Sequence, residues 1–204
     1  MTIVAEPETI ETADWKETLA RLLPAQGCWS EEEYLVLTES TNQLVEYTDG
    51  FIEVLPMPTP RHQLILQYMF LAFLRFVEPR GGRVHFPVLR VRIRPGKFRE
   101  PDLMLLLDAA DPRQQDRYWV GADLALEVVS PDKPQRDLVD KRFDYAEGRI
   151  PEYWIVNPLN DTITVYRLEG ESYVEAGVYG RGQKAASVLL DGCMVDVNAV
   201  FDVK

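Results

Sequence analysis

The hydrophobic and polar positions of the chain repeat with two different periods, which separates its strands from its helices. In "VLRVRIR" (88–94), apolar residues alternate with arginines, the pattern of a strand with one face in water. The runs "LMLLL" (103–107) and "LALEVVS" (124–130) barely alternate, which predicts strands buried on both faces. Turn residues at Asp49-Gly50 and at Pro95-Gly96 each divide a β-rich stretch and predict two hairpins.

Three other stretches carry the signals of helices. Ser30 is a candidate cap and Glu33 completes a capping box, so one helix is expected to begin there. Thr59 caps a longer, almost continuously apolar helix, which Pro79 ends. A third helix is expected at "QRDLVDKRFDYAEG" (135–148), between two strands.

The order of these elements predicts the fold class. The sequence indicates a helix, two strands, a helix, three strands, a helix and at least three further strands. This order is typical of an α+β (α/β) fold with a mixed β-sheet core flanked by helices. We expect one such domain at residues 29–204, preceded by an N-terminal extension at residues 1–28 that contains a short helix.

Composition narrows the function only slightly. The 204 residues are 46% hydrophobic, as in an ordinary globular domain, and their net charge of −11 argues against coating nucleic acid by bulk charge. No apolar run reaches the roughly 20 residues that span a bilayer. Residues 1–20 lack a secretory signal, so a cytoplasmic protein without a membrane partner is expected. Cys28 and Cys193 have no metal-binding spacing.

Two carboxylates stand at the ends of consecutive predicted strands. Asp102 follows Pro101 at the entrance of one strand, and Glu127 lies near the exit of the next. If these strands pair antiparallel, the two acids meet at one rim of the sheet. Ionised carboxylates in a partly dry site repel each other unless a cation neutralises them, and such oxygen ligands suit Mg²⁺ or Mn²⁺.

Further polar side chains are candidates for the same rim. Glu46, on the first strand of the Asp-Gly hairpin, is a possible third carboxylate. Lys141 lies one helical turn after Asp137 and one turn before Tyr145, so the three form one stripe. The ammonium of Lys141 would then lie beside the charge that develops on a phosphate.

Each candidate also has a purely structural interpretation. Asp102 would be a turn acid, Glu127 a core acid paired with a neighbouring cation, and Asp137 and Lys141 a surface ion pair. His62 would simply occupy the first turn of its helix. The structural interpretation predicts that Asp102 and Glu127 lie far apart, whereas the metal interpretation places both within reach of one ion.

Longer stretches of the chain resemble a known family. "EPDLMLL" and "LALEVVSPDKPQRDLVDKRFDYAEGRIPEYWIVNP" resemble the Uma-two family of restriction endonucleases, within the PD-(D/E)xK nuclease superfamily. "VEYTDGFIEVLPMPTPRHQ" is similar to the family's hairpin and the helix after it, which bears a histidine. The similarity extends roughly over residues 30–200.

The resemblance implies a restriction-endonuclease-like core and metal-dependent hydrolysis of DNA. Asp102 and Glu127 would be the PD and (D/E)xK acids, and they would hold Mg²⁺ or Mn²⁺ together with the backbone carbonyl of Val128. The chain departs from the motif at Val129, which stands where the superfamily has its lysine. Some members supply that lysine from the following helix, and Lys141 fits such a position.

The remaining candidates follow from the same resemblance. Glu46 would match an acid that some members contribute from an N-terminal element, and His62, Asp137 and Tyr145 would support the centre. DNA is the expected partner, and cleavage of both strands would favour a two-fold homodimer. Four residues of a cationic segment would position the DNA backbone: Arg90, Arg92, Arg94 and Arg99.

Two alternatives remain open from the sequence. The cationic segment is also explained as a solvated hairpin whose charges protect its edge from pairing. The whole protein is also explained as a nuclease-fold binding or accessory protein with weak or no catalysis. The net charge of −11 and the lack of a recognisable DNA-reading module favour that second function.

Overall fold

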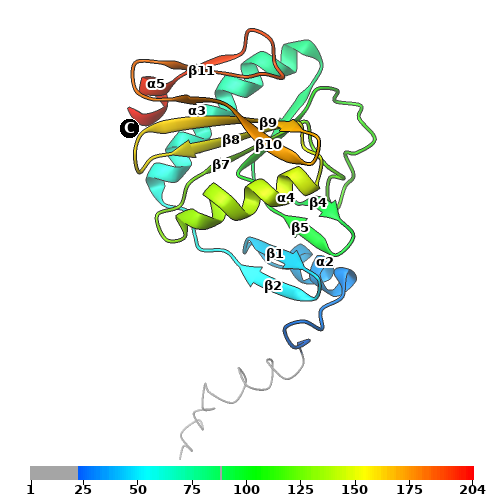
Figure 1. The fold of residues 1–204 in the computed structure, drawn as a ribbon. Coiled ribbons are helices and arrows are strands. Elements are labelled where there is room, and N and C mark those ends of the chain that lie inside the picture. The colour runs from blue at the N-terminus through cyan, green and yellow to red at the C-terminus, as the bar shows by residue number, and fades with distance from the viewer. Residues whose placement is uncertain (1–22, 88) are drawn as a thin grey trace, which may run out of the picture.

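A six-stranded mixed sheet forms the centre of the molecule (Figure 1). The computed structural model describes residues 23–87 and 89–204, so the short helix expected in residues 1–28 falls mostly outside the described residues. The strand order is β10-β9-β8-β7-β6-β3, and every neighbouring pair is antiparallel except β7 and β8. The strands are β3 (Arg83–His85), β6 (Leu103–Leu106), β7 (Leu124–Val128), β8 (Glu152–Asn157), β9 (Thr162–Glu169) and β10 (Ser172–Tyr179).

Helices cover both faces of this sheet. Figure 1 shows α4 (Lys141–Glu147) across one face and α3 (Pro60–Val77) behind the other. Leu103 and Leu105 pack with apolar side chains of α3, whereas Met104 and Leu106 pack on the opposite face with Tyr145. All of β6 is therefore buried, as predicted, and each such side chain contributes about 1.5–3 kcal/mol of hydrophobic stabilisation. The predicted α+β class, a mixed sheet flanked by helices, is confirmed.

A smaller sheet of order β2-β1-β5-β4 lies beside the first. Asp49 and Gly50 both have positive φ, as a two-residue hairpin turn requires, so the predicted hairpin forms there. The capping box of Ser30 and Glu33 is also present and begins the helix that covers this sheet. The elements are α2 (Glu31–Glu39), β1 (Val45–Thr48), β2 (Phe51–Val54), β4 (Val91–Arg94) and β5 (Lys97–Arg99).

The helix between β7 and β8 begins with a wider turn than the sequence predicts. Residues Arg136–Asp140 (η2) form a π-helix, and the N–H of Lys141 donates to the carbonyl of Arg136, five residues earlier. The carbonyl of Asp137 accepts a hydrogen bond from Tyr153 Oη at 2.9 Å. The π turn buries the side chains of Asp137 and Lys141, so their interpretation as a surface ion pair is wrong.

The C-terminal part is held to the sheet by a buried acid. The carboxylate of Glu152, at the start of β8, accepts hydrogen bonds from Ser187 Oγ, Val188 N, Leu189 N and Trp154 Nε1 at 2.6–2.7 Å. Three short elements here and near α3 were not predicted from the sequence. They are η1 (Glu78–Arg80), β3 and α5 (Val197–Phe201), while β11 (Lys184–Ala186) and β12 (Met194–Asp196) pair with each other antiparallel.

Candidate active site

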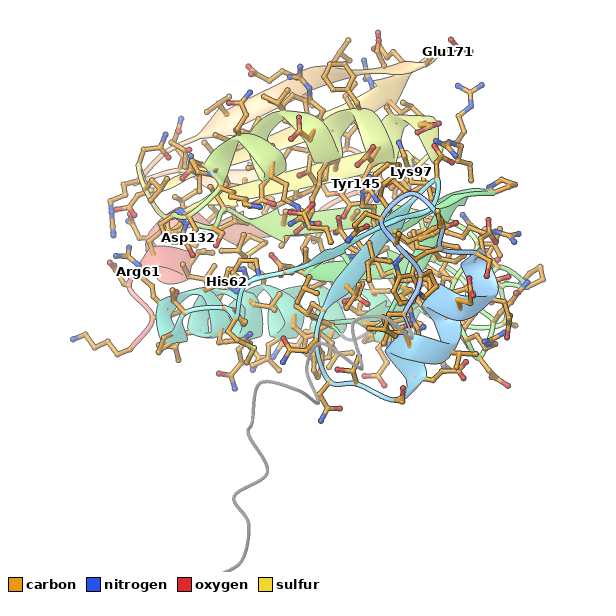
Figure 2. All side chains as sticks on the ribbon, turned by 90° about the horizontal axis from the view of Figure 1, so that it is seen from below. Arg61, His62, Lys97, Asp132, Tyr145 and Glu171 are labelled. Atoms are coloured by element: carbon orange, nitrogen blue, oxygen red, sulfur yellow. The ribbon has the colours of Figure 1, made fainter. Side chains whose placement is uncertain are left out.

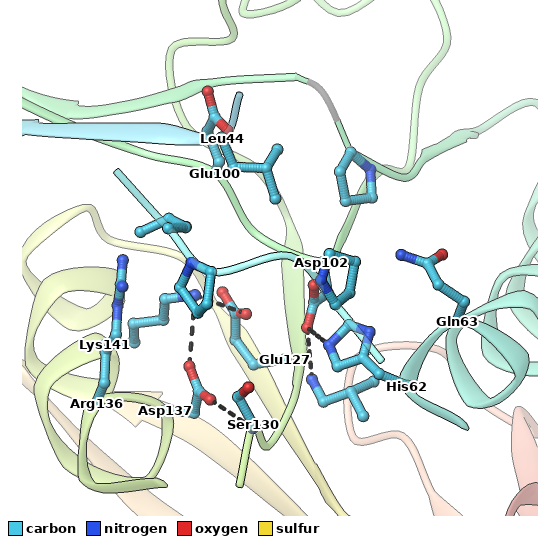
Figure 3. Close-up of a pocket in the computed structure, with 15 residues that line it drawn as sticks. Leu44, His62, Gln63, Glu100, Asp102, Glu127, Ser130, Arg136, Asp137 and Lys141 are labelled. Atoms are coloured by element: carbon cyan, nitrogen blue, oxygen red, sulfur yellow. Dashed lines mark hydrogen bonds and ion pairs between the residues drawn. The ribbon is translucent and has the colours of Figure 1, made fainter. Parts of the chain in front are cut away.

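The antiparallel pairing of β6 and β7 brings the two predicted acids to one rim. Leu103 lies opposite Leu126, so Asp102 and Glu127 occupy the next position of the ladder. Both border a pocket of about 90 Å³ (Figure 3), and the backbone N–H of Val128 donates to Asp102 Oδ2 at 2.8 Å. The interpretation that places the two acids far apart is therefore wrong.

Asp102 is held by two donors. His62, in the first turn of α3, places Nε2 at 3.0 Å from Asp102 Oδ2, beside the N–H of Val128. Burial alone would raise the pKa of Asp102, but the hydrogen bond and charge of His62 lower it overall. Burial alone would lower the pKa of His62, but the hydrogen bond with Asp102 and the charge of that carboxylate raise the pKa overall. His62 thus contacts the site directly and does more than fill a helical turn.

Glu127 and Lys141 form a buried pair. Lys141 Nζ lies 2.7 Å from Glu127 Oε2, and the hydroxyl of Tyr145 donates to Oε1 of the same carboxylate. Glu127 is only 2% exposed and Lys141 only 4%. Burial, with Asp102 and Asp137 nearby, raises the pKa of Glu127 well above its ordinary value, and Lys141 only partly opposes this. Tyr145 is fully buried, whereas Figure 2 shows Glu171 at the edge of the molecule.

Lys141 is the centre of a larger group of carboxylates. Its Nζ is 3.5 Å from Asp137 Oδ1 and 3.9 Å from Glu46 Oε1. Burial alone would lower the pKa of Lys141, but these acids and Glu127 raise it instead. Lys141 is thus a permanent cation at the rim. The same contact also fits the structural interpretation, in which Glu127 is a core acid paired with a cation.

Glu46, the candidate third carboxylate, lies apart from Asp102 and Glu127. Its carboxylate lies 2.5 Å from Arg136 Nη2 and 3.4 Å from Arg99 Nε. It borders a separate hollow with Arg99 and does not line the pocket of Asp102 and Glu127. Glu46 therefore contacts the rim through Lys141, Arg136 and the backbone N–H of Glu100.

Two ionisable residues that border the pocket were not predicted from the sequence. Arg136 precedes Asp137 on the π turn, and its pKa is raised because Glu46 and Glu53 outweigh its burial. Glu100 is 3% exposed, and its Oε2 has no hydrogen-bond partner in the described part of the chain. Burial, followed by the charge of Glu46, raises the pKa of Glu100 to about 8. Only the position of Glu100, two residues before Asp102, could have suggested it.

The side chains at the rim fit one divalent cation. Among the described residues, no three His, Cys, Asp or Glu side chains converge on a common point for a metal. Mg²⁺ commonly takes only one or two carboxylates and keeps several waters, so Asp102 and Glu127 suffice. Five acids and three permanent cations lie around the rim, but burial raises the pKa of Glu100 to about 8 and that of Glu127 well above its ordinary value, so a metal ion would displace protons from the rim rather than meet a fixed excess of negative charge. The acids are Glu46, Glu100, Asp102, Glu127 and Asp137, and the cations are Arg99, Arg136 and Lys141.

The four arginines proposed for DNA contacts do not border this pocket. Arg94 forms ion pairs with Asp49 and Glu147 at 2.8 Å, and the buried Arg99 pairs with Asp144 at 2.7 Å. The other two bond neighbouring hydroxyls: Arg90 to Thr38 and Arg92 to Tyr118. Their contact with a phosphate backbone stays a prediction.

Two other predictions concern the whole chain. Cys28 and Cys193 are both free thiols, one exposed and one buried. In the part of the chain that the structure describes, no helix has the length and apolar character needed to cross a membrane.

The fold and this rim together define a restriction-endonuclease-like protein. Residues 31–198 match the Uma2 family, whose description is "Putative restriction endonuclease", and the chain belongs to this family. A crystal structure of a "putative nuclease belonging to DUF820" from Anabaena variabilis superposes with a TM-score of 0.69 at 21% identity. The match covers 87% of this chain and 98% of that one, and it establishes the shared fold. A comparison with curated proteins gives no match.

Proposed function

We propose that the protein hydrolyses phosphodiester bonds of DNA in a reaction that requires Mg²⁺ or Mn²⁺. The observation that carries the proposal is the convergence of Asp102, Glu127 and Lys141 on one pocket, with Lys141 Nζ 2.7 Å from Glu127. Two carboxyl groups that line one pocket are the kind of oxygen ligands that Mg²⁺ takes, which supports a divalent cation as the cofactor.

Each residue of the rim has a role in this reaction. Asp102 and Glu127 would hold the cation, with Val128 at the same rim. When bound, a divalent cation polarises a phosphate oxygen and lowers the pKa of water. Lys141, positively charged and fixed by its neighbours, stabilises the negative charge that develops as the water oxygen bonds phosphorus and the 3′-oxygen leaves.

Two further side chains keep the acids in place. The hydroxyl of Tyr145 fixes one oxygen of Glu127, which leaves the carboxylate a single orientation toward the pocket. His62 fixes Asp102 in the same way from α3. Because preorganised groups need no rearrangement during the reaction, such positioning lowers the barrier.

Cleavage of supercoiled plasmid by the purified protein tests the proposal. Mg²⁺ or Mn²⁺ should support nicking, and Glu127→Ala and Lys141→Ala should each reduce the rate on the order of a hundredfold or more. Lys133→Ala is the matched control, because Lys133 forms a similar pair with Glu53 at 3.0 Å but is exposed. Activity that survives in Glu127→Ala would show that another site, or a contaminant, cleaves the plasmid.

Metal binding has a readout that does not require activity. Mg²⁺ at about 100 times its Kd should stabilise the wild type by about 2.7 kcal/mol. Asp102→Asn, with one ligand oxygen fewer and the charge removed, should lose most of this stabilisation in a thermal melt.

The accessory function remains the second candidate because the chain has a net charge of −11 and Arg94 and Arg99 are already paired with acids. It predicts that the folded wild type neither binds Mg²⁺ nor cleaves plasmid. That result would replace the nuclease proposal.

A further inference from the structure

A second hollow lies directly beside the candidate active site. Its volume is about 360 Å³, against about 90 Å³ for the pocket of Asp102 and Glu127. Gln63 borders both spaces, so they are neighbours on the surface. The hollow is lined by Gln63, Leu66, Gln67, Phe70, Leu71 and Phe86.

The lining comes from one stripe of α3 and from the residue after β3. Gln63, Gln67 and Leu71 are four residues apart and exposed, whereas the buried side of the helix faces the sheet. Phe86 is 54% exposed and meets Phe70 edge to face, with ring centroids 4.7 Å apart. The surface therefore offers two aromatic rings and two exposed amides, and no ionisable side chain lines it among the described residues.

This chemistry suits a flat, uncharged ligand with polar edges. Aromatic side chains bind nucleobases by stacking, and the amide of glutamine can donate to and accept from a base edge. The net charge of −11 gives the protein little attraction for phosphates, so stacking would supply affinity that charge does not.

The two spaces differ in size and in lining, which indicates what each would bind. The pocket at the rim, at about 90 Å³, is the smaller of the two, and its charged lining suits an ion and a phosphate group. The hollow, at about 360 Å³, lies within the roughly 300–1,000 Å³ of small-ligand sites and has an uncharged lining. A base attached to the reacting phosphate would thus find suitable surroundings in the neighbouring space.

We propose that the hollow between Gln63, Gln67, Phe70 and Phe86 binds an unstacked nucleobase of the strand whose phosphate occupies the rim. The inference rests on the proposed phosphodiesterase function and adds the form of its substrate. A base stacked within a duplex cannot enter the hollow, so the protein prefers single-stranded nucleic acid, or duplex with an unpaired base at the scissile step.

Binding of short fluorescein-labelled oligonucleotides, measured by anisotropy in EDTA at one fixed salt concentration, tests the inference without cleavage. Single-stranded DNA should bind more tightly than its duplex, and Phe86→Ala should weaken single-strand binding about tenfold. Phe143→Ala, at a phenylalanine on α4 that is 63% exposed, is the matched control and should leave binding unchanged. A strand containing 2-aminopurine should lose fluorescence on binding to the wild type but not to Phe86→Ala.

Gln67→Ala separates reading of the base edge from stacking. It should change the relative affinities for strands that differ only in the bases they contain, whereas Phe86→Ala should weaken them all. A single-stranded RNA arm identifies the source of the base: tighter binding of RNA that Phe86→Ala also weakens would support the site and assign it to RNA.

Three outcomes overturn the inference. The first is equal binding of single strands by the wild type and Phe86→Ala, and the second is no binding by the wild type. The third is a dimer in sedimentation that Phe86→Ala dissociates, which would make the hollow a contact between copies. Failure of the nuclease proposal is distinct: the wild type would then bind single strands through Phe86 yet fail to nick plasmid with either metal.

Discussion

Replacing Lys141 by methionine tests whether the buried group of charges depends on this one cation. Its ammonium lies 2.7 Å from Glu127, 3.5 Å from Asp137 and 3.9 Å from Glu46. At an effective dielectric constant of about 20, these distances correspond to attractions of about 6, 5 and 4 kcal/mol. Desolvation of the charges offsets most of this sum, and removal of one partner of a buried pair typically costs about 3–5 kcal/mol.

The protonation of Glu127 limits the loss. Burial already raises the pKa of Glu127 beside Lys141, and loss of the lysine removes the main group that opposes this rise. A protonated Glu127 in the folded variant costs about 1.36 kcal/mol per pH unit above its unfolded pKa of about 4.3, which sets a ceiling of about 3.7 kcal/mol at pH ~7. The wild type shares this cost up to its own raised folded pKa, so the additional loss in the variant grows only as pH rises above that value and vanishes at acid pH.

Urea unfolding of the metal-free protein at several pH values measures this loss. Lys141→Met should lose up to about 3–4 kcal/mol at neutral pH with an unchanged m-value. The double variant Lys141→Met/Glu127→Gln should recover most of the loss. Lys133→Met, in an exposed pair with Glu53, should lose about 1 kcal/mol or less. Equal losses in Lys141→Met and Lys133→Met, or a loss independent of pH, would refute the reasoning.

Two further substitutions have defined outcomes. The pKa of His62 is raised in the folded protein, so its pairing with Asp102 stabilises the fold fully below the unfolded histidine pKa of about 6.5. This stability is lost as pH rises through the folded pKa of His62. The pKa of Asp102 is lowered, so its share of the stability is present above the unfolded aspartate pKa of about 3.9. The stability that His62→Ala loses in urea melts without metal should therefore be largest between these values and shrink at alkaline pH, and a pH-independent loss would contradict the pairing. Glu152→Ala should destabilise by on the order of 3 kcal/mol, because the backbone N–H groups of Val188 and Leu189 lose their acceptor. Hydrogen exchange should then speed up at these two amides, and unchanged protection there would show that Glu152 does not anchor this loop.

The elements that could be predicted from the sequence are those with strong local signals. The capping box at Ser30, the Asp49-Gly50 turn and the helix capped by Thr59 all form as expected. In each case the signal depends on neighbours within four residues, so the tertiary structure has little to add. The meeting of the two rim acids was also predictable, because Asp102 directly precedes one apolar strand and Glu127 lies near the end of the next.

The short elements could not be predicted in this way. The strand Arg83–His85 has three residues and no clear alternation, and it exists because Leu106 and Met104 of β6 offer it a ladder. The π turn at Arg136–Asp140 also involves a residue far along the chain. The hydroxyl of Tyr153, on β8, donates a hydrogen bond to the carbonyl of Asp137.

The sequence by itself indicated the candidate residues of the rim: the acids Asp102 and Glu127 and the lysine of the following helix. Only the tertiary structure decided the surroundings of these residues. It placed Glu46 behind Lys141 with Arg136 and Arg99, brought His62 onto Asp102, and left Phe86 and Gln67 exposed beside the pocket. The reason is physical, because an acid in an apolar strand is visible locally, whereas contacts among side chains from separate elements depend on how the strands and helices pack.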